Sequence, residues 1–246
     1  FDEETVRAAI LCRLTSLSLG KSGVHIEAIE LMRDLLNYRI TPLIFQHGGV
    51  GASGDLVQLA HLALVLIGEG EVFYKGARRP TAEVFAEVGL KPLQIHLREG
   101  LSLINGTSVM TGLAGVNVYY AQKLLDWTVK FTTAINELVQ TYDDHFSSEL
   151  NNAKQHTGQK EIARMMRDFL HDSKRTRKRA EHLYQGEHNE TVFKEKVQEY
   201  YSLRCVPQIL GPVLDTLQHT QRIFEEELNS ANDNPIVDLP TQQVYH

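Results

Sequence analysis

The sequence is poor in cysteine, in long apolar runs and in clustered positive charge. Its two cysteines, Cys12 and Cys205, lie far apart and fit neither a metal-ligand nor a redox spacing. We expect both to be reduced and structural, which favours a cytoplasmic protein. The longest apolar stretch, residues 56–67, contains a glutamine and a histidine and is too short to cross a bilayer, so no membrane partner is expected.

Positive charge is also scarce and scattered. Lysine and arginine number 25 against 31 acidic residues, and the net charge is −6. Nucleic-acid binding needs a concentrated basic surface, so this partner is not expected. The densest basic run, residues 174–179, is interpreted as a solvated helix face, with an anion or partner patch as the alternative.

The chain has 246 residues, 42% of them hydrophobic, as is ordinary for a globular protein. It opens at Phe1 in helical-looking sequence without an initiator methionine, and it stops abruptly at His246. We interpret residues 1–246 as a single helical catalytic domain that is an interior fragment of a longer chain.

Apolar side chains recur at steps of three and four residues, which predicts amphipathic helices. The expected fold is all-α, a bundle of long, mostly antiparallel helices, with one small β excursion at about residues 71–80. A short helix capped by Thr81 should run to Glu87, and residues 150–196 resemble exposed charged helices and loops. The long helices are predicted over residues 4–19, 25–37, 55–67 and 107–138, and from about Pro207 and Pro212 to about Asn229.

The glycine-rich stretch from His47 to Leu56 is the most informative part of the sequence. It could be a flexible loop between helices, with Ser53 or Asp55 as an N-cap. A phosphate-binding loop is disfavoured, because the Gly-Lys-Ser/Thr ending that supplies a phosphate-binding lysine is missing.

A third interpretation of this stretch is chemical. Compression of Ala52-Ser53-Gly54 would let the amide nitrogen of Gly54 attack the carbonyl carbon of Ala52. Glycine offers the least steric hindrance to such an attack because it has no side chain. Loss of water closes a five-membered ring, and elimination of the Ser53 hydroxyl leaves an exocyclic methylene. The product is 4-methylidene-imidazol-5-one, an electrophile that no unmodified side chain can match.

Four motifs raise this interpretation above chance. They are GGVGASGDL before a buried helix, LINGTSVMTG opening another, QEYYSLRCVPQ opening a third and NSANDNP closing it. In this order, and over essentially all of the chain, the sequence resembles the histidine/phenylalanine/tyrosine ammonia-lyase family, and most of all bacterial tyrosine and histidine ammonia-lyases.

The resemblance implies that Ala52, Ser53 and Gly54 form the prosthetic group, with Asp55 assisting its formation. It implies that Asn105 hydrogen-bonds near the electrophile and the substrate's amino group. From the sequence alone, Asn105 could equally be a helix N-cap.

In QEYYSLRC, the resemblance points to three polar active-site residues. Tyr201 would act on the ring carbonyl or in proton transfer, Arg204 would clamp the substrate carboxylate, and Gln198 would bind substrate. Arginine suits the clamp because its planar fork donates two parallel hydrogen bonds. Tyr201 is preferred to Tyr200 because it directly precedes Ser-Leu-Arg; taken alone, Tyr201 and Arg204 could be a surface pair.

Asp55, Asn105 and Pro207 each stand at or near a predicted helix start, where free N–H groups and partial positive charge gather. We hypothesise that these helix starts converge and deepen the electron deficiency of the methylene. The NSANDNP motif, residues 229–235, is expected to be a structural helix exit held by side-chain hydrogen bonds.

The resemblance implies an ammonia-lyase acting on a small aromatic L-amino acid. L-Tyrosine giving trans-p-coumarate is favoured, and L-histidine giving urocanate comes next. A tyrosine upstream of Phe1 would be the base, and a homotetramer would build each site from several subunits. The alternatives are an aminomutase with the same prosthetic group and a catalytically dead helical scaffold.

No metal and no diffusible cofactor are expected. His25, His47, His61 and His96 lack the ligand spacing found along a metal-binding helix, and buried or surface histidines account for them better.

Overall fold

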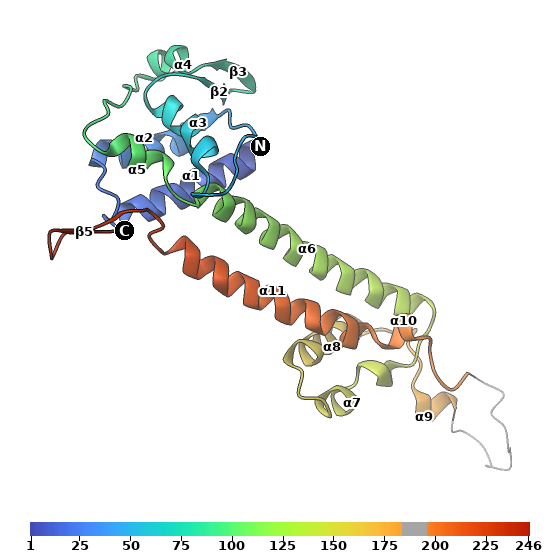
Figure 1. Ribbon diagram of the computed structural model, residues 1–246. Coiled ribbons are helices and arrows are strands. Elements are labelled where there is room, and N and C mark those ends of the chain that lie inside the picture. Colours follow the sequence, from blue (N-terminus) through green and yellow to red (C-terminus); the bar gives the residue numbers. More distant parts are fainter. Residues whose placement is uncertain (184–195) are drawn as a thin grey trace. The chain divides into compact units, whose positions relative to one another are not determined.

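The computed structural model describes residues 1–183 and 196–246. It divides into two compact units, of which unit 1 comprises residues 1–117 and 221–246 and unit 2 comprises residues 118–220. Figure 1 shows that the described elements are mostly helices, which confirms the all-α prediction. None of the helices in the described ranges combines the length and the apolarity that a bilayer crossing requires. The prediction of a single catalytic domain stays a prediction.

Unit 1 is built around five helices and parts of two longer ones. Asp2 caps the first helix by accepting a hydrogen bond from the Thr5 backbone at 2.7 Å, and two glutamates in the first turn complement the helix dipole. The helices are α1 (Glu3–Ser18), α2 (Ile26–Asn37), α3 (Leu56–Leu66), α4 (Thr81–Val88) and α5 (Glu99–Ile104), joined by the start of α6 (Ser108–Leu138) and the end of α11 (Val206–Leu228).

The core of unit 1 lies between α1, α2 and α3. Ile10, Met32, Leu35 and Leu59 have no exposed surface, and each such side chain contributes about 1.5–3 kcal/mol by leaving water. The apolar faces predicted for α1 and α2 are therefore largely the buried faces, but Ile26, predicted to be inside, is 60% exposed.

Strands are few and short. β2 (Glu71–Tyr74) and β3 (Ala77–Pro80) form the hairpin predicted at residues 71–80, joined by Lys75 and Gly76. Both loop residues have positive φ, 51° and 77°, as a two-residue type I′ turn requires. The sequence did not predict β1 (Thr41–Pro42), which pairs with β2, nor the hairpin of β4 (Ile236–Asp238) and β5 (Gln243–Tyr245).

Unit 2 holds most of α6 and of α11 together with several short helices. Ile162 and Met166 of α8 are fully buried against Val129 and Phe146, so α8 is amphipathic and not simply exposed as predicted. The short elements are η1 (Asp143–Phe146, a 3₁₀ turn), α7 (Ser148–Asn152), α8 (Thr157–Leu170), α9 (Arg179–His182) and α10 (Tyr201–Arg204). Residues 184–195, within the region predicted as helices and loops, lie outside the described residues.

Three further predictions need correction. Thr81 begins α4 but does not cap it: Pro80 holds the N-cap position and the Thr81 hydroxyl is buried without a hydrogen-bond partner among the described residues. Helix α5 was missed because it is only six residues long and contains Gly100. The basic run is no helix face, because residues 174–178 are irregular apart from one bridge residue, Arg177, and α9 starts only at Arg179.

Candidate active site

The glycine-rich loop connects β1 to α3 and is exposed from Phe45 to Ser53. Gly48, Gly51 and Gly54 have φ angles of 112°, 70° and 82°, which residues with a side chain rarely adopt. The loop is therefore an ordered sequence of glycine-dependent turns that ends at the start of α3.

Gly54 lies directly against Gly106, just before α6. The two residues form a parallel bridge, and the backbone N–H of Asp55 donates to the Gly106 carbonyl at 2.8 Å. A Cβ placed on Gly54 would stand 2.3 Å from the Gly106 oxygen, closer than any real contact. Glycine is thus required at the position where the sequence analysis placed the attacking nitrogen, and Ala52-Ser53-Gly54 fits the predicted prosthetic group.

Asp55 caps a helix other than its own. It occupies the N-cap position of α3 without a side-chain capping bond there. Its Oδ2 instead accepts hydrogen bonds from the backbone N–H groups of Val109 and Met110, both at 2.9 Å, in the first turn of α6. The carboxylate therefore joins the end of the loop to the α6 N-terminus, an arrangement favoured by the helix dipole.

Asn105 is half-buried and is the C-cap of α5. The alternative prediction, that Asn105 is a helix N-cap, is therefore wrong. Its backbone carbonyl accepts a hydrogen bond from Arg13 at 2.8 Å. Arg13 is fully buried and also pairs with Asp233 at 2.9 Å. Burial lowers the pKa of Arg13, and the charge of Asp233 offsets part of that effect.

The NSANDNP segment is tied to this buried arginine. Besides Asp233, Asn232 accepts from Arg13 at 3.4 Å, and Asp233 also accepts a short hydrogen bond from Ser22. The structural role expected for residues 229–235 is therefore to hold Arg13, which in turn hydrogen-bonds the Asn105 backbone. The role of Arg13 could not be predicted from the sequence, because a single arginine on an amphipathic helix gives no signal of burial.

A pocket of about 260 Å³ opens beside the loop in unit 1. Gly49, Gly51, Gly54 and Asp55 border it on the loop side. The remaining lining side chains belong to the chain start, α3 and α6: Phe1, Gln58, Val109, Met110 and Leu113.

Gln198, Tyr201 and Arg204 lie in unit 2. Tyr200 is the N-cap residue of α10, and Tyr201 and Arg204 are its first and last residues. The Arg204 guanidinium stacks on the Tyr201 ring at 4.6 Å, and its Nε is buried with no hydrogen-bond partner in the described part of the chain. Tyr201 is 71% exposed and Gln198 is exposed as well. Arg204 can therefore take an additional acceptor such as a carboxylate.

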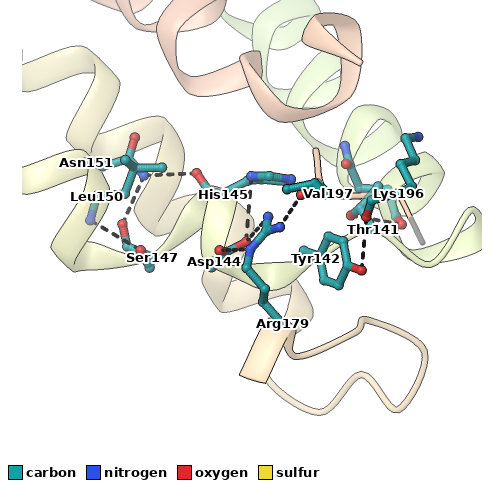
Figure 2. Close-up of polar contacts among 11 residues, drawn as sticks. Thr141, Tyr142, Asp144, His145, Ser147, Leu150, Asn151, Arg179, Lys196 and Val197 are labelled. Atoms are coloured by element: carbon teal, nitrogen blue, oxygen red, sulfur yellow. Dashed lines mark hydrogen bonds and ion pairs between the residues drawn. The ribbon is translucent and has the colours of Figure 1, made fainter. Parts of the chain in front are cut away.

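The segment that leads into this motif is held by two side chains. Figure 2 shows Tyr142 donating to the Lys196 carbonyl at 3.2 Å and Arg179 donating to the Val197 carbonyl. Arg179 is itself fixed by Asp144, at 2.6 Å, and stacks on the Tyr142 ring. One member of the predicted basic run thus positions the backbone just before Gln198.

His145 lies next to this segment and is buried, with Nε2 lacking a hydrogen-bond partner among the described residues. Desolvation lowers its pKa, although the nearby carboxylate of Asp144 acts in the opposite direction. His145 is therefore held neutral in the fold.

The predicted site residues form two clusters. Ala52, Ser53, Gly54, Asp55 and Asn105 meet in unit 1, and the α3 and α6 starts converge there as hypothesised. Gln198, Tyr201 and Arg204 meet in unit 2, as does the helix start at Pro207. That the second cluster faces Ser53 stays a prediction.

Comparison with known proteins bears directly on these clusters. A family model described as aromatic amino acid lyase matches residues 1–246. The tyrosine 2,3-aminomutase of Myxococcus sp. (strain Mx-B0) is 42% identical over all of this chain and 48% of its own length. The histidine ammonia-lyase of Bacillus velezensis is 40% identical over 96% of this chain and 44% of its own length.

Solved structures agree. The phenylalanine aminomutase of Pantoea agglomerans superimposes with a TM-score of 0.92 at 34% identity, covering 100% of this chain and 48% of that one. The chain thus spans about half the length of the relatives it matches. The match of this family model over residues 1–246 means that the chain belongs to the aromatic amino acid lyase family.

Proposed function

We propose that this chain contributes to an enzyme that eliminates ammonia from L-tyrosine to give trans-p-coumarate, with L-histidine as the next candidate substrate. The observation that carries the proposal is the fixed position of Ala52-Ser53-Gly54 against Gly106 and the start of α6. The names of the relatives, which include tyrosine and histidine enzymes, support this choice of substrates.

The proposed prosthetic group is 4-methylidene-imidazol-5-one, formed from Ala52, Ser53 and Gly54 without a diffusible cofactor. The group supplies an electrophilic methylene that makes ammonia an acceptable leaving group. Gly54 provides the ring nitrogen, and its lack of a side chain lets it fit against Gly106. Asp55 keeps this end of the loop in place through its two hydrogen bonds to α6.

Substrate binding is assigned to the polar residues of both clusters. Arg204, with its unpartnered buried Nε, would hold the α-carboxylate, and Gln198 would bind beside it. Tyr201 would hold or move a proton, and the Asn105 side chain would hydrogen-bond the amino group. Arg13 fixes the Asn105 backbone and so acts only as a positioning residue.

An aminomutase is the second candidate, because the tyrosine relatives at 42% identity are named tyrosine 2,3-aminomutase. Such an enzyme shares the elimination and then returns ammonia to the β-carbon. Product analysis with L-tyrosine separates the two: free ammonia with p-coumarate supports the lyase, and β-tyrosine as the main product overturns it.

The prosthetic group itself is tested by mass. A peptide spanning Gly48 to Leu56 from the active protein should be lighter than its sequence by two waters. Ser53→Ala, which removes the hydroxyl to be eliminated, should abolish that loss and lower kcat/KM on the order of 10³-fold or more.

Ser18→Ala is the matched control, since Ser18 is exposed on α1 and away from the loop. It should keep both the mass loss and the activity. Near-normal turnover in Ser53→Ala would refute the proposed chemistry.

A further inference from the structure

Three side chains that are far apart in the sequence meet on unit 1, outside the candidate active site. His25 directly precedes α2, His96 lies three residues before α5, and Glu99 is the first residue of α5. One ring nitrogen from each histidine and one carboxylate oxygen of Glu99 all lie within 4.8 Å of one another. Ligand spacing along a single helix does not reveal this cluster, because its members come from two segments that are far apart in the sequence.

Glu99 is the fixed member of the cluster. Its side chain is fully buried, and its oxygens accept hydrogen bonds from the backbone N–H groups of His25, at 2.7 Å, and His96, at 2.8 Å. Burial alone would raise the pKa of Glu99, but these hydrogen bonds outweigh it and lower the pKa. The carboxylate is therefore ionised and firmly oriented.

The backbone bonds explain why Glu99 is there, but they leave the two imidazoles unexplained. Any residue other than proline at positions 25 and 96 would donate the same N–H groups. Both histidine side chains are exposed, yet their rings lie only 4.5 Å apart between centroids, and the Nδ1 of His25 stands 2.8 Å from Glu99. Two exposed imidazoles are thus held beside one buried negative charge.

This donor set indicates the class of ligand. Magnesium and calcium prefer oxygen ligands only, whereas two imidazoles and a carboxylate suit Zn²⁺, which binds such groups at about 2.0–2.2 Å. The three donor atoms lie within 4.8 Å of one another, and the two exposed rings would rotate to reach zinc-ligand distances. A pocket of about 290 Å³ borders both histidines and leaves room for water ligands.

We propose that His25, His96 and Glu99 bind one Zn²⁺ ion. The hydrogen bonds from the backbone to Glu99 act as the supporting shell that orients a ligating carboxylate. The ion links the start of α2 to the turn before α5, and α5 ends at Asn105, next to the Gly106 that holds the loop. Zinc at this site stabilises unit 1 and takes no part in the reaction.

The test uses the full-length protein, stripped with a chelator and titrated with zinc sulfate by calorimetry. We expect one Zn²⁺ per chain at this site, and a rise in Tm of roughly 5–10 °C at 100-fold excess over Kd. Magnesium sulfate should produce neither effect.

His25→Gln and His96→Gln should each weaken zinc binding at least about tenfold, by analogy with other lost metal contacts. The His96 side chain is exposed, so His96→Gln should keep the wild-type Tm without metal, whereas His25→Gln also removes the contact between His25 Nδ1 and Glu99. His171→Gln is the matched control, because His171 is exposed and lies 3.0 Å from Asp172 but joins no group of three metal-ligating side chains within the described ranges.

Loss of binding in the two site variants and its retention in His171→Gln supports the site. No zinc binding by the wild-type protein, or equal binding by wild type and His96→Gln, overturns it. Neither result depends on turnover, so the outcome is independent of the proposed lyase activity.

Discussion

A single missing side chain decides the geometry of the candidate site. Gly54 combines a φ of 82° with a position against the Gly106 carbonyl where a Cβ would have only 2.3 Å. Gly51, three residues earlier, has a similar φ of 70°, but a Cβ on it would meet no atom of the described residues within 4 Å. Substitutions at the two glycines therefore distinguish the free-energy cost of a positive φ, which both positions share, from the cost of a steric clash, which only Gly54 has.

Gly54→Ala should lower the free energy of unfolding by more than about 2–3 kcal/mol, because it adds a backbone clash to the strain of a positive φ. Gly51→Ala should lose only about 1 kcal/mol. Urea unfolding of both variants measures the difference. Equal losses would mean that the contact between Gly54 and Gly106 is absent.

His145 gives a prediction for pH dependence. Desolvation lowers its pKa below the ordinary value of 6.5, so the unfolded chain takes up this proton at a higher pH than the folded chain. The stability contributed by neutral His145 is thus complete above about pH 6.5 and falls as the pH drops below it.

Replacing His145 with glutamine should flatten the fall in Tm between about pH 7.5 and pH 5.5. His171→Gln changes an exposed histidine and should leave the slope as in the wild type. An unchanged slope in His145→Gln would show that this side chain is hydrated in the fold.

At the scale of elements, the spacing of apolar residues predicted the helices and strands whose formation depends on local sequence. The long helices α1, α2, α3, α6 and α11 follow from their apolar stripes, and the β2–β3 hairpin follows from alternation and its glycine turn. Periodicity could not predict α5, which is too short for a period, or β1, which exists only by pairing with β2.

Site residues divide in the same way. The loop motif predicts Ser53 and Gly54 as site residues, but the contacts that Gly106 and Arg13 make there join segments distant in the sequence. The cap made by Asp55 on α6 is a further example, since the sequence suggested only a cap on the following helix.

Asp55→Ala should destabilise the protein by about 1–2 kcal/mol, because two N–H groups of α6 lose their acceptor. Asp2→Ala removes an ordinary cap from α1 and should cost about 1 kcal/mol. Mass analysis then distinguishes them: only Asp55→Ala should leave a fraction of the Gly48–Leu56 peptide at its full unmodified mass. A complete loss of two waters in Asp55→Ala would exclude its proposed assistance.

At the scale of the whole molecule, unit 2 exposes apolar side chains along one face of α6. Leu124 is 70% exposed, Phe131 61% and Leu138 62%, and Trp127 stacks on Phe131 between them. Their spacing of three, four and seven residues is that of a single helical stripe. Such a stripe is typical of a surface covered by another subunit, as the homotetramer that the resemblance implies would require.

Leu124→Glu combined with Phe131→Glu should break the expected homotetramer of the full-length protein into smaller species, because charges would be buried at the contact. Light scattering with size-exclusion chromatography measures the mass. Gln155→Glu adds a charge at an exposed polar position and should leave the mass unchanged. A tetramer that persists in the double variant would place the subunit contact elsewhere.

The bridge between Gly54 and Gly106 also limits what protein engineers can transplant. Residues 47–55 grafted alone into another helical protein would lack two partners of Asp55. These are the Gly106 carbonyl, which accepts a hydrogen bond from the Asp55 N–H, and the first turn of α6, whose N–H groups donate to the Asp55 carboxylate. A transplanted site therefore has to include two segments, the loop and residues 105–110. The recipient protein has to hold them in the same relative position.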